Sequence, residues 1–369
     1  MTKKLNIGVM FGGRSGEHAV SLMSARFVLS QLDPAKYAIT QIGITRDGRW
    51  WVGEDVLSAL DAEDTASLHA ATLLPDPTRG GLKQIGEDER LATLAELDVI
   101  FPVLHGTFGE DGTLQGLFEM AGVAYVGAGV LGSSVAMDKA VFFDLMRAHD
   151  IPVVDSVLVL RSELQADPDA VLDHVEQLGS YPLFVKPANL GSSVGVSKVT
   201  SRSDLVEGLM EAAQYDRRVI VQRGHNVREI EISVLGNDQP EASVPGEIVP
   251  GAEFYSYESK YHDDRSVSHI PADITAEQAA QVTEIAIRAY KACDLAGMAR
   301  VDFFVDKDNG AVLLNEINTI PGFTRISMYP MLWQASGLEG PQLVDRLIAL
   351  ALERQADRQA TTHEFRRGN

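Results

Sequence analysis

The sequence predicts an α/β protein that continues into a strand-rich α+β region, and two observations support this prediction. In the first third of the chain, short apolar strands alternate with helices, which is typical of an open parallel sheet. Beyond about residue 127 this regular alternation is lost, and after residue 218 most segments have strand patterns. At about 150 residues per domain, the 369 residues allow two or three domains.

The N-terminal part is predicted to alternate strands, turns and helices. Strands are predicted over residues 5–11, 37–44, 99–104 and 123–126, with helices over 18–32 and after Gly112. The stretch 53–95 is a mixture of Ala, Asp and Glu that contains Pro75-Asp76-Pro77. It predicts helix and loop decoration on this sheet.

The remainder of the chain is predicted to hold five helices and seven strands. The helices are predicted over 134–149, 168–178, 203–213, 275–293 and 341–355, and Pro341 suits the first turn of the last one. The strands are predicted over 156–160, 183–187, 218–222, 229–235, 242–249, 299–305 and 311–318.

Composition and charge exclude several classes of function. The formal charge of −20 argues against a nucleic acid or an anionic membrane surface as partner. The single cysteine, Cys293, excludes an intramolecular disulfide and a cysteine-built zinc site. No apolar run approaches about 18 residues, so no membrane span is expected. The first apolar run ends in Gly12-Gly13-Arg14 without a cleavage pattern, so a strand and a cytoplasmic location are expected.

Two familiar fingerprints are weak in this chain. The run Gly127 to Gly132 matches the dinucleotide pattern G-x-G-x-x-G, which would support an NAD-dependent dehydrogenase as an alternative function. Its strand does not open a clean βαβ unit. A calcium loop ending at Glu316 fails, because Val305 and Lys307 would occupy positions that require oxygen ligands.

An acidic hairpin is a more informative motif. The Asn-Gly pair at Asn309 is a strong turn signal between two strand-like runs. Pairing that is symmetric about Asn309 places Asp302 opposite Glu316 and Arg300 opposite Asn318. Two carboxylates and an amide oxygen would then converge beside an arginine, a donor set that suits Mg²⁺. The alternative is a solvated, outward-facing surface of the hairpin.

Loops that follow apolar strands supply further candidate ligand contacts. Lys186 ends one such strand and needs an anionic partner, and the Gly-Ser loop 191–195 offers N–H groups and hydroxyls to phosphate. The alternative is a plain turn. Glu17, in a glycine loop, and His105 follow strands of the N-terminal sheet, at the edge where ligands bind in open α/β folds. Glu17 could instead be a carboxylate that favours the start of a helix.

These segments together resemble the D-alanine–D-alanine ligases of the ATP-grasp superfamily. The matching stretches follow the family's order within about residues 5–350: 12–22, 104–116, 137–139, 185–195, 228–231, 257–261, 300–302 and 315–324. The resemblance implies an N-terminal open parallel-sheet α/β domain over 1–127, which binds the first D-alanine. An ATP-grasp fold of two lobes is implied over 128–221 and 222–369, with a lid loop at about 250–264 that closes over substrate.

The resemblance implies ATP-dependent ligation of two D-alanines through a D-alanyl phosphate, with release of ADP and phosphate, for peptidoglycan precursor synthesis. Two Mg²⁺ ions are implied as cofactors, with Mn²⁺ as a substitute, and a homodimer is expected. A D-alanyl-D-lactate-type ligase is the alternative within the family. The Lys260-Tyr261 pair favours D-alanine, because lactate-forming relatives lack that pair.

The resemblance also implies a role for each site residue. Those implied to bind ATP are Lys139, Lys186, Ser192, Ser193, Gln222, Arg223, His225, Glu229, Phe254, Lys260 and Asn315. Those implied to bind the metal ions are Asp302, Glu316 and Asn318. Those implied to bind D-alanine or to act in catalysis are Glu17, His105, Ser192, Tyr261, Arg300, Gly322, Ser327 and Met328. The chain departs from many relatives at Gln222, where they have Glu; an amide oxygen can still accept from the adenine amine.

Overall fold

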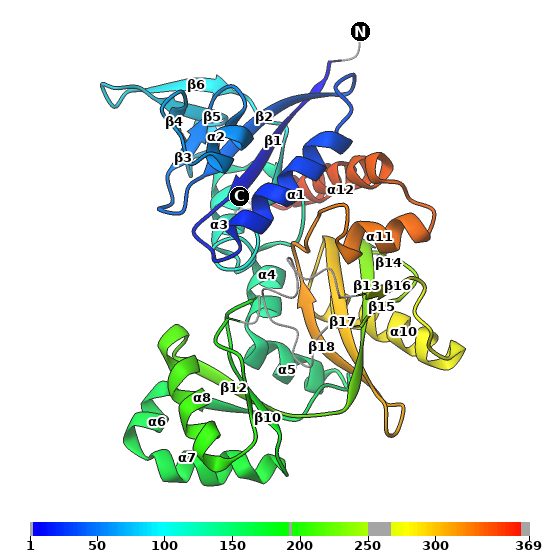
Figure 1. The fold of residues 1–369 in the computed structure, drawn as a ribbon. Helices are drawn as coiled ribbons and strands as arrows, with labels where there is room; N and C mark the ends of the chain where they lie inside the picture. The colour runs from blue at the N-terminus through cyan, green and yellow to red at the C-terminus, as the bar shows by residue number, and fades with distance from the viewer. Residues whose placement is uncertain (1–2, 192–193, 250–266, 363–369) are drawn as a thin grey trace, which may run out of the picture.

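The computed structural model describes residues 3–191, 194–249 and 267–362, and these form three sheets with helices packed against them (Figure 1). The N-terminal sheet has the order β6-β5-β4-β3-β2-β1-β7-β8. Its parallel strands are β1 (Leu5–Gly12), β2 (Tyr37–Ile44), β7 (Val99–Val103) and β8 (Ala124–Tyr125). The predicted α/β fold class is confirmed, and so is the initial strand.

The prediction of helix and loop decoration for residues 53–95 was wrong in part, because three strands of this stretch, together with β3 just before it, extend the sheet in antiparallel pairs. The added strands are β3 (Trp50–Val52), β4 (His69–Leu73), β5 (Leu82–Ile85) and β6 (Leu91–Ala95), with the short helix α2 (Val56–Asp61) between β3 and β4. Four of the five β6 residues are exposed. A strand that buries neither face lacks the apolar alternation that predicts strands.

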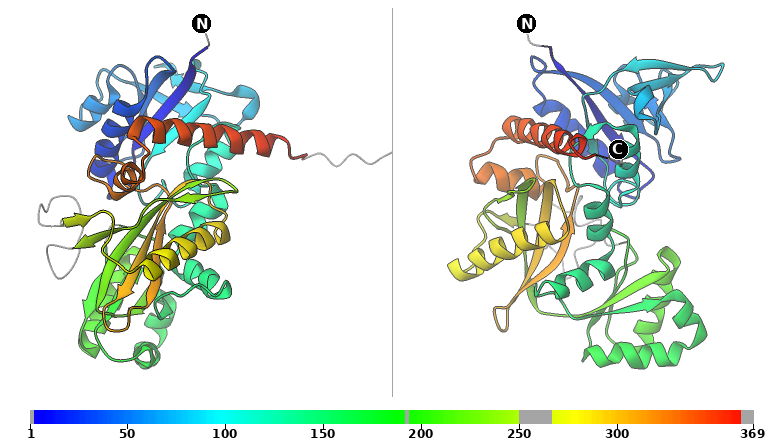
Figure 2. Two further views of the ribbon diagram at one scale, coloured as in Figure 1. Left: turned by 90° about the vertical axis from the view of Figure 1, so that its right-hand side faces the viewer. Right: turned by 180° about the vertical axis from the view of Figure 1, so that it is seen from behind.

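Helices cover both faces of the N-terminal sheet. One face packs against α1 (His18–Gln31) and the last helix, α12 (Gly340–Gln359), through residues such as Val28 and Leu347. The other face packs against α3 (Thr113–Ala121) through Phe118. Figure 2 shows α12, in red, lying along the N-terminal unit. The C-terminal helix therefore helps to complete the core of the first sheet.

The middle of the chain forms a four-stranded antiparallel sheet of order β11-β10-β12-β9. Its strands are β9 (Ser156–Leu160), β10 (Leu183–Pro187), β11 (Ser197–Val199) and β12 (Arg218–Arg223). The helices of this lobe are α6 (Arg161–Ala166), α7 (Pro168–Val175) and α8 (Arg202–Tyr215). Strand β11 and helix α6, both of which are short, were not predicted.

The predicted helix 134–149 was also wrong as one element, because it is two helices, α4 (Val130–Met137) and α5 (Lys139–Ala148). The break lies at Asp138, whose backbone is extended. Its carboxylate accepts N–H bonds from Ala140 and Val141, each 3.1 Å long, and so caps α5. The Asp138 cap therefore sets the position of Lys139 at the start of α5.

The third sheet has the order β16-β15-β13-β17-β18, with β14 paired to β13. Its strands are β13 (Val227–Gly236), β14 (Glu241–Ala242), β15 (Gly246–Val249), β16 (Val267–His269), β17 (Gly297–Asp306) and β18 (Val312–Asn318). Helices α10 (Ala276–Ala292) and α11 (Met328–Ala335) accompany this sheet. The predicted strand 242–249 is thus two strands, and α11 was not predicted.

The hairpin register was predicted correctly. In the β17–β18 pair, Asp302 lies opposite Glu316 and Arg300 lies opposite Asn318. A register shift follows between Asp302 and Phe303. The prediction succeeded up to that irregularity because the turn signal and the two-residue period agree.

The dinucleotide alternative is not supported by the fold. The strand that follows β8 in the chain belongs to the middle sheet, so the Gly127–Gly132 loop does not open a βαβ unit. The glycines serve packing instead: a Cβ on Gly132 would lie 2.7 Å from Leu295. Arg354 donates to the Gly127 carbonyl over 2.6 Å. In the described part of the chain, no helix is long and apolar enough to cross a membrane.

Candidate functional site

A cavity of about 1490 Å³ is lined by residues of all three sheets and their loops. It brings together sixteen of the predicted site residues, which are separated by up to 311 positions in the chain. They are Glu17, His105, Lys139, Lys186, Gln222, Arg223, His225, Glu229, Arg300, Asp302, Asn315, Glu316, Asn318, Gly322, Ser327 and Met328. The other five predicted residues, Ser192, Ser193, Phe254, Lys260 and Tyr261, lie outside the described residues.

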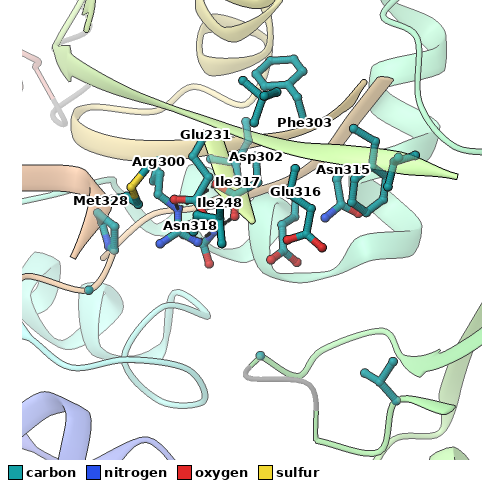
Figure 3. A pocket seen from close by; sticks show the side chains of 18 of the residues that line it. Glu231, Ile248, Arg300, Asp302, Phe303, Asn315, Glu316, Ile317, Asn318 and Met328 are labelled. Carbon is teal, nitrogen blue, oxygen red and sulfur yellow. Dashed lines mark hydrogen bonds and ion pairs between the residues drawn. The ribbon is translucent and has the colours of Figure 1, made fainter. Parts of the chain in front are cut away.

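The acidic hairpin faces this cavity, as Figure 3 shows for Arg300, Asp302, Glu316 and Asn318. Arg300 donates to both carboxylate oxygens of Asp302, over 2.7 Å each. The amide of Asn318 donates to Asp302 Oδ2 over 3.0 Å. Asp302 is only 8% exposed, so the alternative of a solvated hairpin surface is wrong. Because the strands fix all four backbones, these side chains hold their spacing.

Glu231, on the neighbouring strand β13, is a second acidic partner of Arg300. Its Oε2 lies 2.9 Å from Arg300 Nε, and the residue is 6% exposed. Burial opposes a charged guanidinium, but Asp302 and Glu231 outweigh it and raise the pKa of Arg300 well above its ordinary value. Arg300 therefore stays positively charged at the wall of the cavity. Glu231 belongs to one of the family-like stretches, 228–231, but no role was predicted for it.

Lysines face the acidic hairpin across the cavity. The Nζ of Lys139 donates to the Leu190 carbonyl over 2.8 Å and lies 3.8 Å from Glu316 Oε2. The neighbouring Asp138 is itself tied down, because it accepts from Asn189 over 2.9 Å and pairs with Arg218. Lys186, on β10, lines the same cavity. The chain is strongly acidic overall, yet it concentrates cations here beside paired carboxylates.

Buried amides line another part of the cavity, near the crossing from the middle to the third sheet. Gln222, at the end of β12, is 3% exposed. Among the described residues, its Nε2 has no hydrogen-bond partner, and neither has Asn315 Oδ1. Buried polar atoms without partners are costly and point to a polar ligand. Close by in the chain, His225 Nδ1 lies 3.1 Å from Asp306 Oδ2.

Glu17 lies where the loop after β1 meets two glycines. A Cβ on Gly106, whose φ is +72°, would lie 2.5 Å from Glu17 Oε2. A Cβ on Gly191 would lie 3.2 Å from the same oxygen. The backbones of two other loops therefore approach this carboxylate closely, and at Gly106 the positive φ also favours glycine.

His105 lines the cavity, but both of its ring nitrogens have partners in the chain. Nδ1 donates to the Ile320 carbonyl over 2.8 Å, which leaves Nε2 to accept from the Ser24 hydroxyl over 3.0 Å. Burial lowers the pKa of His105, which agrees with this neutral form. Ser24 Oγ in turn accepts the N–H of Phe323 over 3.1 Å. His105 thus joins α1 to the segment that contains Gly322.

The same segment leads to the start of α11. Ser327, the residue before this helix, accepts from the Thr324 N–H over 3.0 Å, and the two hydroxyls lie 2.8 Å apart. A Cβ on Gly322 would lie 3.0 Å from Ser327 Oγ. Helix N-termini favour anionic groups. The cavity therefore borders the N-terminus of α11, where Ser327 and Met328 line it.

Glu110 also lines the cavity, and no role was predicted for it from the sequence. Its Oε2 accepts from the Gly106 N–H and its Oε1 from the Ile320 N–H, over 2.8 Å each. Burial, with repulsion from Glu17, raises its pKa to about 8, although both N–H bonds and Arg300 oppose the shift. The family-like stretch 104–116 contains this residue, but no sequence signal identifies its distant partner Ile320.

Comparisons with known proteins agree with this site. Two family models match the chain: "D-ala D-ala ligase N-terminus" over residues 6–128 and "D-ala D-ala ligase C-terminus" over residues 145–349. The D-alanine–D-alanine ligase of Heliobacterium modesticaldum is 49% identical over 361 residues, which cover 98% of each chain. The D-alanine–D-alanine ligase of Geobacillus kaustophilus is 45% identical over 366 residues, which cover 99% of each.

Solved structures of this family have the same fold. The D-alanine–D-alanine ligase from Coxiella burnetii superposes with a TM-score of 0.83 at 38% identity and covers 97% of both chains. The VanG D-Ala:D-Ser ligase from Enterococcus faecalis superposes with a TM-score of 0.84 at 37% identity, over 95% of this chain and 100% of that one. Since the family models span most of the sequence and full-length relatives share nearly half of it, the chain belongs to the D-alanine–D-alanine ligase family of ATP-dependent ligases.

Proposed function

We propose that this chain joins two D-alanines at the expense of ATP, with a D-alanyl phosphate as intermediate and ADP and phosphate as products. The observation that carries the proposal is one cavity that holds Glu17, the lysines and the Arg300–Asp302–Glu316–Asn318 cluster. Phosphoryl transfer to a carboxylate requires cations around the phosphates and donors around the oxyanion. Lys139 and Lys186 are the proposed cations, and Arg300 and the Gly322 N–H are the proposed oxyanion donors.

The carboxylates of the hairpin fit a site for Mg²⁺. The proposed ligands are the carboxylates of Asp302 and Glu316 and the amide oxygen of Asn318, which line the cavity together. Among the described residues, no group of three or more Asp, Glu, His or Cys side chains is placed to hold a metal ion by itself. Mg²⁺ prefers a few such oxygens together with substrate phosphates. Two bound Mg²⁺ ions, or Mn²⁺, would neutralise charge on the phosphoryl group during its transfer.

The cations and buried amides fit ATP. We assign Lys139 and Lys186 to its phosphates, with Ser192, Ser193 and Lys260 as further predicted contacts. The base is assigned to the wall that includes Gln222, because an orphaned amide donor there suits a nitrogen heterocycle. The other residues assigned to the nucleotide are Arg223, His225, Glu229, Phe254 and Asn315.

The N-terminal side of the cavity fits the two amino acids. Glu17 is assigned to the ammonium of the first D-alanine, and His105 holds the adjoining segments in place. Arg300 and the Gly322 N–H are assigned to the oxyanion that forms at its carboxyl carbon; one such donor is typically worth about 3–4 kcal/mol. Ser327 and the N–H of Met328 at the start of α11 are assigned to the carboxylate of the second D-alanine.

Several finer points belong to the same proposal. Tyr261 and Ser192 are proposed to link the lid, about 250–264, to Glu17, and the Lys260-Tyr261 pair favours D-alanine over D-lactate as acceptor. The proposed units are 1–127, 128–221 and 222–369. A homodimer in the cytoplasm that supplies peptidoglycan precursors is the proposed context.

The product decides this proposal. The purified chain is incubated with ATP, Mg²⁺ and D-alanine, and phosphate release is measured alongside chromatographic and mass analysis of the product. We expect D-alanyl-D-alanine with an amide bond and one phosphate per dipeptide. Equal activity with L-alanine, or no dipeptide from D-alanine, would refute the proposal. An ester product in mixtures with D-lactate would favour the lactate-type alternative.

A further inference from the structure

Two segments that are assigned to different steps of the reaction meet at one carboxylate. Glu110 accepts the Gly106 N–H through one oxygen and the Ile320 N–H through the other, over 2.8 Å each. Of the two glycines beside Glu17, Gly106 lies closer to its carboxylate, and Ile320 begins the segment that contains Gly322. A single side chain therefore spans the ammonium subsite and the oxyanion segment.

The segment 320–323 has two further hydrogen-bonded anchors in the N-terminal unit. The carbonyl of Ile320 accepts from His105, and the N–H of Phe323 donates to Ser24. The Ile320 peptide is thus held at both its N–H and its carbonyl, and Glu110 is the anchor at the N–H. Gly322 lies between the anchored residues, so its N–H direction depends on them.

We propose that Glu110 is a positioning residue for the ligase reaction: its carboxylate fixes the segment 320–323, and with it the Gly322 N–H, relative to the Glu17 subsite. This rests on the proposed roles of Glu17 and Gly322. Oxyanion donors act through their fixed direction, and a misplacement of about 1 Å can cost about 100-fold in rate. Glu110 thus acts on turnover through backbone geometry and touches no reacting atom.

The test compares the full-length wild type with E110Q and a matched control, D111N. Gln keeps the size of the side chain but has one acceptor oxygen, so one N–H bond is lost. Asp111 also accepts two backbone N–H bonds, from Phe108 over 2.9 Å and from Thr113 over 3.0 Å, but both lie within its own loop. D111N therefore perturbs the same turn without altering the link to Ile320.

Dipeptide formation is measured across ATP and D-alanine concentrations, and hydrogen exchange is followed in the peptide that contains 319–324. For E110Q we expect kcat to fall about 10- to 100-fold, KM for ATP to stay within about twofold, and exchange in 319–324 to accelerate. For D111N we expect kcat within about twofold of wild type and unchanged exchange in that peptide. If the melting temperatures of both variants fall by the same amount, general destabilisation cannot explain a loss of kcat that occurs in E110Q alone.

A kcat for E110Q within twofold of D111N would overturn the proposal, and so would unchanged exchange in 319–324. If E110Q does not fold, E110D replaces it, because a carboxylate one methylene shorter cannot reach both N–H groups; E110D with wild-type kcat would then overturn the proposal. Absence of dipeptide with the wild type would instead refute the proposed function, while the exchange measurements still decide whether Glu110 holds the segment.

Discussion

The two sides of the cavity are built in different ways. On the β17–β18 hairpin, side chains make the site: Arg300 and Asp302 are locked together by two 2.7 Å bonds on paired strands. On the N-terminal side, close backbone approach makes the site, since Gly106 and Gly191 both lie against Glu17. Activity should therefore be sensitive to changes of side-chain charge on the hairpin. On the N-terminal side it should be sensitive to side-chain atoms added at the glycines beside Glu17.

The largest expected effect is on the hairpin. D302N should lower kcat about 100- to 1000-fold, because it replaces a proposed anionic metal ligand with a neutral amide and leaves one acceptor oxygen for the two Arg300 bonds. Dipeptide synthesis and the Mg²⁺ concentration for half-maximal rate measure this. The control is E241Q, which alters an exposed Arg346–Glu241 pair and should leave kcat unchanged. A kcat for D302N within tenfold of wild type would contradict the assigned role.

A smaller effect is expected from one methyl group on the N-terminal side. In G106A the new Cβ meets Glu17 Oε2 and the backbone keeps a φ of +72° that Ala disfavours. KM for the first D-alanine should rise about 10-fold, with a loss of about 1 kcal/mol in unfolding free energy.

The control for this change is G116A. Gly116 lies inside α3, and a Cβ added there would have no neighbouring atom within 4 Å. Ala at this position should therefore stabilise the chain by up to about 1 kcal/mol. D-alanine saturation curves and urea unfolding distinguish the two variants. Equal KM values for G106A and G116A would show that a methyl group added beside Glu17 does not affect binding of the first D-alanine.

A third substitution tests whether a side chain of the middle sheet, Gln222, determines which nucleotide base is bound. Q222E replaces the buried Nε2 donor with an acceptor, so a base that carries a 6-keto oxygen loses a hydrogen-bond partner. The ratio of kcat/KM for ATP to that for ITP should rise about threefold or more. Rates with both nucleotides measure this ratio. A ratio that stays the same or falls would show that Gln222 does not contact position 6 of the base.

The smallest expected effect is on the pH dependence of stability, and it concerns Glu110, whose carboxylate joins the N-terminal side of the cavity to the segment after β18. Because folding raises the pKa of Glu110 from 4.5 to about 8, the folded chain keeps a proton that the unfolded chain has released. The stability that this group contributes therefore falls as the pH rises from about 5 to about 8. Burial is the main cause of the raised pKa and repulsion from Glu17 adds to it, while the two backbone N–H bonds and Arg300 partly offset it.

E110Q has no proton to lose in this window. Its melting temperature should therefore fall by about 2–4 °C less than that of wild type between pH 5.5 and pH 8. Thermal unfolding at several pH values measures the two slopes, with D111N as control. Parallel slopes for wild type and E110Q would show that Glu110 is ionised throughout.

Local signals explain what could be predicted from the sequence. The pairing of Asp302 with Glu316 followed from a turn dipeptide and a two-residue period, both of which lie within the hairpin. The sheet strands between residues 53 and 95 were missed because β6 is largely exposed. The contact between Glu110 and Ile320 spans 210 positions, so no local pattern could indicate it.

The helix break at Asp138 could not be predicted from the sequence for a different reason. Good helix formers such as Ala136, Met137, Lys139 and Ala140 lie on both sides of this residue, so the composition predicts one helix that continues across it. The extended backbone at Asp138 is stabilised by contacts with Asn189 and Arg218, which come from distant parts of the chain. Tertiary contacts therefore divided the helix and placed Lys139 at the new N-terminus.

The position of α12 has a consequence for synthesis on the ribosome. Leu343, Val344 and Leu347 share one apolar core with Ile7 and Phe101 of the first sheet. When β1 and β7 leave the exit tunnel, the helix that covers them has not yet been translated. The nascent N-terminal sheet must remain incompletely covered until residues 340–359 have been translated, so its apolar surface is exposed to non-native contacts during that time.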